Sequence, residues 1–271
     1  MRTENLTPHI GSMIHGVDLS RPLDDNLRDR IRQTLYERQV IFFRDQNLTA
    51  RRQLDLANVF GMPVASPHPK FGCVDQLPEV SRVINDERNA PDINVWHSDV
   101  SYHAEPATTC VLHAIEVPES GGDTLWSSML RAYDTLSEPM RAFLAPLKAY
   151  HRLQLDGYPI DLVKQAVGQP ISAIHPVVRR IPELDRKSLF VNRVYTHRIE
   201  GLRPCESSGL LGALCEHAES PDHQVRFRWS KGAVAIWDNR STQHFAVADY
   251  FPQRRVMHRV AVQGAPVIAA G

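Results

Sequence analysis

Two histidines and one carboxylate are the residues of this sequence with the clearest potential for chemistry. His97 and Asp99 lie two positions apart in a Trp-His-Ser-Asp segment, and His244 follows much later in the chain. Residues i and i+2 of a strand point to the same face, so an imidazole and a carboxylate there could hold one metal ion. A His-x-Asp pair alone arises often by chance. With a second histidine the set matches the facial triad of non-haem Fe(II) oxygenases, which leaves three coordination positions open. Its lack of thiolates disfavours a structural zinc site.

Two arginines near the end of the chain form a second group with chemical potential. If their segment is a strand, the spacing of Arg255 and Arg259 places both on one face, with Met257 between them. The neighbouring valines favour an embedded strand over an exposed one. Because a buried guanidinium is costly without a partner, inward-facing arginines predict carboxylate or sulfonate ligands, which this planar group binds in a bidentate manner.

The elements that would position these residues are mostly short strands. Apolar residues at i, i+4 and i+8, preceded by Asp24 as N-cap, predict a helix over 24–38. Further helices are predicted at 49–60, 135–147 and 209–217. Short β-branched or aromatic runs predict strands at 40–43, 108–114, 188–192, 224–229, 233–237 and 257–263, with a hairpin loop at 230–232.

This pattern predicts a mainly β protein with flanking helices, in which residues 1–271 form one domain. A doubly wound α/β fold is the alternative. It is disfavoured because no Gly-x-Gly-x-x-Gly segment follows a predicted strand.

The charge balance and the cysteines limit the classes of partner. The chain has 31 Lys+Arg and 31 Asp+Glu residues, without the clustered basic surface that nucleic-acid binding requires. No segment has the length and apolarity of a membrane span or a secretory signal. The four cysteines form no Cys-x-x-Cys pair and are interpreted as reduced thiols. We therefore expect no nucleic-acid or membrane partner and a cytoplasmic location.

The segments around these candidate residues carry a family resemblance. The chain resembles the taurine dioxygenase/2,4-dichlorophenoxyacetate dioxygenase (TauD/TfdA) family of Fe(II)- and 2-oxoglutarate-dependent enzymes. Each matching segment is weak alone, but together they follow the family's order and spacing nearly end to end. They lie at residues 14–19, 40–46, 96–99, 121–126, 175–179, 189–192, 236–244 and 254–259.

The resemblance implies a fold and a metal site. The family fold is a double-stranded β-helix, a jelly roll or cupin-like barrel flanked by helices. His97, Asp99 and His244 match the family's iron ligands. Family members are often dimers or tetramers, so a homo-oligomer is expected.

The resemblance also implies a reaction. Thr124 and Arg255 match the residues that bind the distal carboxylate of 2-oxoglutarate, and Arg259 matches the arginine that binds the anionic group of the substrate. Fe(II), 2-oxoglutarate and O2 would hydroxylate a small anionic organic molecule, with succinate and CO2 as coproducts. If the hydroxylated carbon bears a sulfonate, sulfate ester or aryloxy group, the product breaks down.

Departures from the family pattern concern the substrate. Ser66 stands where the taurine branch has a substrate-binding histidine, His68 follows two positions later, and Ile93 replaces an asparagine. Trp126 is the tryptophan expected to contact the substrate. We therefore expect a sulfonate such as taurine or a relative with a more apolar tail, with an alkyl sulfate or an aryloxyalkanoate as the alternative.

Two other classes of function are compatible with the same residues. One is a non-catalytic metal- or anion-binding jelly-roll protein. The other is a zinc hydrolase, which would need a general base near a metal-bound water, and the sequence offers no such base beyond the ligands themselves. The complete triad together with both arginines favours the oxygenase. Dependence of turnover on O2 and 2-oxoglutarate would distinguish it from both.

Overall fold

The computed structural model describes residues 1–65, 72–91, 93–153 and 171–270. Within this part of the chain the largest sheet has nine strands in the order β1-β2-β3-β15-β7-β17-β6-β5, with β4 paired to β17. These strands are β1 (Arg2–Asn5), β2 (Ser12–His15), β3 (Val40–Phe43), β4 (Pro63–Val64), β5 (Gly72–Val74), β6 (Leu77–Asn85), β7 (Thr109–Glu116), β15 (Val234–Asp238) and β17 (Arg255–Val262).

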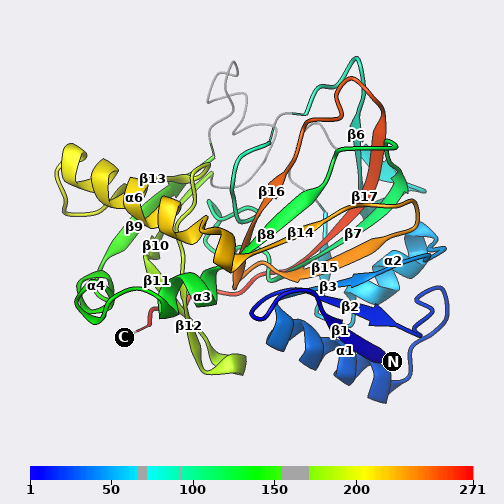
Figure 1. Ribbon diagram of the computed structural model, residues 1–271, viewed down its shortest axis with the longest axis horizontal. Coiled ribbons are helices and arrows are strands. Elements are labelled where there is room, and N and C mark those ends of the chain that lie inside the picture. The colour runs from blue at the N-terminus through cyan, green and yellow to red at the C-terminus, as the bar shows by residue number, and fades with distance from the viewer. Residues whose placement is uncertain (66–71, 92, 154–170, 271) are drawn as a thin grey trace.

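A second sheet, of three strands, lies against the interior face of the first. It consists of β14 (Gln224–Phe227), β8 (Thr124–Ser128) and β16 (Thr242–Ala246), in that order. Phe42 of β3 joins the two sheets, because its ring stacks on Phe227 with centroids 4.1 Å apart and meets the edge of Trp126 at 5.3 Å. The two facing sheets form the predicted jelly roll (Figure 1).

The strand β3 shows why its sequence is a continuous apolar run. Val40 and Phe42 face the space between the sheets, whereas Ile41 and Phe43 pack in the cluster beneath the helices. A strand covered on both faces has no polar side, so four consecutive apolar residues are required. Helices α1 (Asp25–Arg38) and α2 (Ala50–Ala57) cover the outer face of the large sheet. Ile31 of α1 is one of the fully buried residues in the cluster between these helices and the sheet.

The remaining helices gather with two small β units at the other end of the molecule (Figure 1). One unit pairs β10 (Ser172–Pro176), β9 (Lys148–Arg152) and β13 (Thr196–Ile199), and the other pairs β11 (Val178–Ile181) with β12 (Arg186–Leu189). Their apolar residues share a cluster with α3 (Met129–Asp134), α4 (Glu138–Leu144) and α6 (Pro204–Ala218). Short 3-10 turns occur at Pro182–Leu184 and Pro221–His223. None of the helices in the described ranges is long and apolar enough to cross a bilayer.

The sequence-based elements are confirmed in type but not always in extent. Asp24 and Thr49 cap α1 and α2 as expected, although α2 ends before residue 60 in a series of tight turns. The helix expected at 135–147 is shorter, because Ser137 caps α4. The helix expected at 209–217 begins at Pro204. The strand expected at 188–192 ends at Leu189.

The hairpin predicted at 230–232 is wrong. β14, before this loop, pairs with β8, whereas β15, after it, pairs with β3 and β7. The loop therefore crosses from one sheet to the other. The residues of the loop cannot show whether it joins two strands of one sheet or crosses to the other sheet, because the chain must turn in both cases.

Candidate metal centre and cosubstrate site

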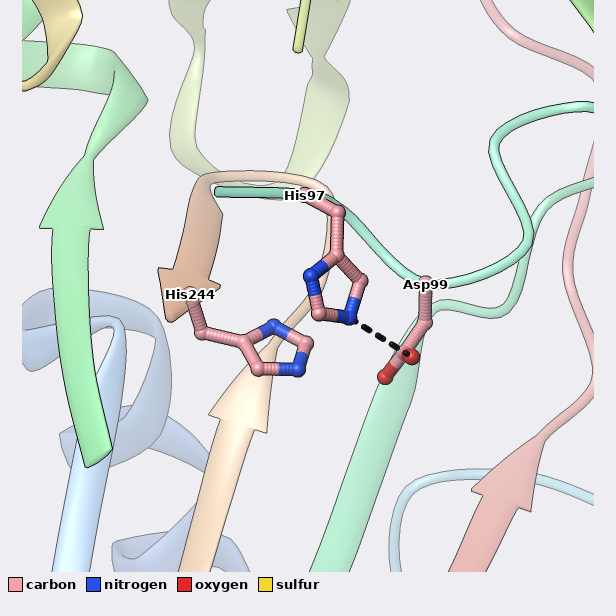
Figure 2. A group of neighbouring side chains, drawn as sticks. All are labelled: His97, Asp99 and His244. Carbon is pink, nitrogen blue, oxygen red and sulfur yellow. Dashed lines mark ion pairs between the residues drawn. The ribbon is translucent and has the colours of Figure 1, made fainter. Parts of the chain in front are cut away.

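The structure brings His97, Asp99 and His244 together. One potential ligand atom from each lies within 4.8 Å of the others, and the three side chains converge as Figure 2 shows. His244 lies on β16, and the backbones of His97 and His244 exchange hydrogen bonds of 3.0 and 2.8 Å. The spacing of His97 and Asp99 suggested a strand, but neither residue lies on a regular strand. His97 forms a single bridge to β16, and Asp99 lies in a turn.

The two imidazoles are held in the form that binds metal. Nδ1 of His97 lies 2.8 Å from the carbonyl oxygen of Val95, which can only accept, so Nδ1 carries the proton and Nε2 is left with its lone pair. That Nε2 lies 3.9 Å from Oδ1 of Asp99. Burial lowers the pKa of His97, and it lowers the pKa of His244 to about 3, so both rings stay neutral at physiological pH. Neutral imidazole is the metal-binding species.

Asp99 is ionised and held on its other oxygen. Burial by itself would raise the pKa of this carboxyl group, but the neighbouring charges, that of Arg259 first, outweigh burial and lower it. Nη2 of Arg259 lies 2.9 Å from Oδ2 of Asp99, and the thiol of Cys110 donates to the same oxygen at 3.2 Å. Burial raises the pKa of Cys110 well above its usual value, so the group is a thiol.

The side chain of Asn239 fixes the backbone of the Asp99 turn. Its Oδ1 accepts from the backbone N–H of Asp99 at 2.8 Å, and its Nδ2 donates to the carbonyl oxygens of Asp99 and Ala107, both at 2.9 Å. Sequence reasoning gave Asn239 no role at the site, and Cys110 none at all. The only available signal for Asn239 was its place in the Trp-Asp-Asn-Arg segment shortly before His244.

A cavity of about 650 Å³ opens onto these residues, and both predicted arginines line it. Arg255 and Arg259 lie on β17 and face the same side, as their spacing indicated. Four residues of strand separate their Cα atoms by roughly 13 Å. The cavity therefore carries one guanidinium beside Asp99 and a second one farther along the strand.

The region around Arg255 is built from aromatic rings and one hydroxyl. The guanidinium carbon of Arg255 lies 5.9 Å from the ring centres of both Trp229 and Tyr250. Nε1 of Trp229 donates to Oγ1 of Thr124 at 3.0 Å, which leaves the Thr124 hydroxyl hydrogen free to point elsewhere. Nε of Arg255 is buried and has no hydrogen-bond partner among the described residues. A buried donor without a partner predicts an absent acceptor.

The other predicted substrate contacts are only partly described. Ser66 and His68 lie outside the described residues. Trp126 lines the cavity, is fully buried, and lies nearly parallel to His244 with ring centres 6.4 Å apart. Tyr102 and Tyr195 also line the cavity, and their rings meet edge to face at 5.0 Å.

Comparisons with known proteins agree with the family resemblance of the sequence. The family model described as "Taurine catabolism dioxygenase TauD, TfdA family" matches residues 2–261. The chain belongs to this family. It is similar to an alkylsulfatase from Acinetobacter baylyi, with 34% identity over 97% of this chain and 85% of the relative. It is also similar to an alpha-ketoglutarate-dependent sulfate ester dioxygenase from Pseudomonas putida, with 35% identity over 94% of this chain and 87% of the relative.

A solved structure of a taurine dioxygenase from Burkholderia xenovorans superposes with a TM-score of 0.88. It shares 36% sequence identity, and the match covers 99% of this chain and 91% of the other. The predicted TauD/TfdA membership and the predicted jelly-roll fold are thereby confirmed. The protein is a 2-oxoglutarate-dependent dioxygenase, and its family implies O2 as the second cosubstrate.

Proposed function

We propose that this dioxygenase uses Fe(II), held by His97, Asp99 and His244, to hydroxylate a small organic sulfonate or sulfate ester. The observation that carries the proposal is the contact of 2.9 Å between Arg259 and Asp99 in the cavity. This contact puts the cation that would bind the substrate's anionic group beside a metal ligand. A carbon adjacent to that group would then lie next to the metal.

The donor set suits Fe(II). Two neutral imidazoles and one ionised carboxylate converge without a thiolate ligand, and they leave the rest of the coordination sphere to small molecules. Bound iron, 2-oxoglutarate and O2 would supply oxidative chemistry: one atom of O2 would go into succinate as 2-oxoglutarate loses CO2, and the other would enter a substrate C–H bond. The protein contributes binding, orientation and exclusion of water.

Arg255 and Thr124 are proposed to bind the distal carboxylate of 2-oxoglutarate. The unpartnered Nε of Arg255 supports this role, and so does the Thr124 hydroxyl, whose oxygen already accepts from Trp229. Two fixed donors would orient the cosubstrate before O2 arrives. The flanking rings exclude water, which strengthens a charged hydrogen bond.

Arg259 is proposed to bind the sulfonate or sulfate. Burial lowers the pKa of this guanidinium, but Asp99 more than compensates and raises it above its usual value, so the group stays charged. Its contact with Asp99 uses Nη2, and the remaining donors are left for an anion. The side chains of Ile93, Val100 and Leu112 also line the cavity and predict an apolar tail on the substrate.

One observation favours a second candidate, the aryloxyalkanoates. The paired rings of Tyr102 and Tyr195 form an aromatic wall, against which an aryl group of the substrate could pack.

A substrate panel tests the proposal. Taurine, butanesulfonate, butyl sulfate and 2-phenoxypropionate are incubated with Fe(II), 2-oxoglutarate and O2, and succinate, aldehyde, sulfite, sulfate and phenol are measured. We expect the two butyl compounds to have the highest kcat/KM, with aldehyde and sulfite or sulfate formed in equal amounts. Preference for taurine by a wide margin would contradict the apolar tail. Preference for 2-phenoxypropionate would favour the second candidate.

The assembly and location are also proposals. We propose that residues 1–271 act as one catalytic domain of a cytoplasmic homo-oligomer, a dimer or tetramer, as the family resemblance implies. Light scattering coupled to size-exclusion chromatography measures the mass directly. A monomer at micromolar concentration would contradict the oligomer.

A further inference from the structure

Cys110 occupies a fully buried position in the large sheet beside the candidate metal centre. It lies on β7, where its neighbours in register are Trp237 of β15 and Ala261 of β17. Its side chain belongs to the apolar cluster between the two sheets. A thiol packs in such a position as a small apolar group, so packing alone does not require sulfur there.

The thiol of Cys110 makes polar contacts to Asp99 and Arg259, and these two residues also contact each other. Sγ of Cys110 donates to Oδ2 of Asp99 at 3.2 Å, and it accepts from Nη2 of Arg259 at 3.4 Å. Nη2 of Arg259 also contacts Oδ2 of Asp99 at 2.9 Å. A side chain without a polar hydrogen and a lone pair could not make both contacts of the thiol.

Both contacts to the Asp99 carboxylate fall on the same oxygen. Oδ2 takes Arg259 and Cys110, while Oδ1 lies 3.9 Å from Nε2 of His97. No hydrogen bond to Oδ1 is found among the described residues. The carboxylate is thereby fixed with one oxygen turned toward the histidines and the other turned toward the sheet.

We propose that Cys110 is a positioning residue, whose thiol holds Oδ2 of Asp99 so that Oδ1 faces the metal. This inference rests on the proposed function. With Arg259 alone, one nitrogen would hold the carboxylate, and that nitrogen belongs to the same guanidinium that binds the substrate anion. The thiol supplies a second point of attachment that is independent of the substrate. Groups that orient metal ligands in this way affect metal affinity although they do not touch the metal.

The test uses Mn(II) as the metal probe and the apoprotein of residues 1–271 without cosubstrate. Binding is followed by the loss of the free Mn(II) signal in electron paramagnetic resonance. We expect Cys110→Ala to weaken Mn(II) binding about tenfold. Cys110→Ser keeps a donor and an acceptor and is expected to stay within about twofold of wild type. Cys215→Ala removes a buried thiol from the separate cluster under α6 and serves as the matched control, with no expected change.

A second measurement separates positioning from packing. With a turned-over substrate, Cys110→Ala should form more succinate per molecule of hydroxylated product, because a loosely held ligand orients the site less well. Thermal unfolding checks that each variant is folded. If Cys110→Ala does not fold, Cys110→Val carries the same expectation, because it fills the space without a polar hydrogen.

The outcomes distinguish this inference from the function on which it rests. Mn(II) binding by Cys110→Ala that is as tight as wild type, or Cys110→Ser as weak as Cys110→Ala, overturns the role of the thiol. So does an equal loss of binding in Cys215→Ala. Wild-type protein that fails to bind Mn(II), or that binds no better than His97→Ala, instead overturns the proposed metal site.

Discussion

At the scale of single residues, burial sets the charge states on which the proposed site depends. The lowered pKa of both candidate histidines keeps them neutral, and Arg259 keeps Asp99 ionised. Arg255 differs because no ion pair with a carboxylate is found for it among the described residues: Tyr250 contacts it, and Asp123, which acts on it electrostatically, pairs with Arg226 instead. A buried cation without a counter-ion is costly, which is the residue-level argument for an anionic cosubstrate.

Replacement of Arg255 tests this argument. Arg255→Gln removes the charge and the paired donors, and a hydrogen bond between charged groups contributes about 1.5–3 kcal/mol. We expect the KM for 2-oxoglutarate to rise about tenfold or more, with a smaller effect on kcat at saturating cosubstrate. Arg254→Gln is the matched control, because Arg254 is exposed and pairs with Glu116. Equal effects in the two variants would contradict the assignment.

The residue types and spacing singled out the candidate ligands and both arginines, which the structure brings to one cavity, but they could not identify the groups that hold them. His97, Asp99 and His244 stand out because few other roles need that combination. Cys110 and Asn239 act through contacts made only after distant segments meet. A single cysteine or asparagine in a strand or turn belongs to no periodic pattern from which such a contact could be predicted.

At the scale of elements, strands were predictable where an apolar or β-branched run showed that the strand is buried. The apolar run in β3 and the valines of β17 located those strands. The connection at 230–232 and the turn at Asp99 were not predictable, because the pairing of distant strands decides both. The short helix α3 was missed, because six residues carry too little periodicity to be recognised.

The loop between β7 and β8 offers an element-level prediction. Gly122 in this loop has φ of +70°, and an added Cβ would lie 3.1 Å from Cδ1 of Tyr250 and 3.4 Å from Cδ of Arg255. Gly201 has φ of +78° with no neighbour within 4 Å of such a Cβ. Alanine at either position should cost about 1 kcal/mol of stability through the backbone. We expect only Gly122→Ala to raise the KM for 2-oxoglutarate, by several-fold, because only its methyl group crowds Tyr250, whose ring lies beside Arg255. An equal KM for both variants would contradict the proposed binding of 2-oxoglutarate by Arg255.

At the scale of the whole molecule, the buried histidines contribute to the loss of stability in acid. Burial lowers the pKa of His151 to about 3 and that of His113 to about 4, from an ordinary value of 6.5. Below pH 6.5 the unfolded chain takes up protons that the folded protein excludes, so stability falls as the pH falls toward these lower values.

Urea unfolding at pH 7 and pH 5 measures this effect. One such histidine contributes up to about 1.4 kcal/mol per pH unit. His151→Gln should therefore lose up to about 2 kcal/mol less stability than wild type between these two values of pH. His9→Gln, at an exposed position, should behave as wild type does. The same pH dependence in all three proteins would contradict the burial argument.

The fold of the whole molecule was predictable only in class from the residues themselves. The many short strands predicted a mainly β protein, whereas the jelly roll came from the family resemblance. Strand order depends on pairings such as those of β15 with β3, almost 200 positions away in sequence, and with β7, about 125 positions away. Local propensity contains no information about those partners.

We propose that His97, Asp99 and His244 hold an iron that binds 2-oxoglutarate, with Arg255 on the distal carboxylate. Anaerobic titration of the apoprotein with Fe(II) and then 2-oxoglutarate, followed by visible absorption, tests it most directly. We predict a weak charge-transfer band that needs both additions. The band should be absent in His97→Ala and should require more 2-oxoglutarate in Arg255→Gln. A folded, iron-loaded wild type without the band, or a His97→Ala protein with an unchanged band, would contradict the claim.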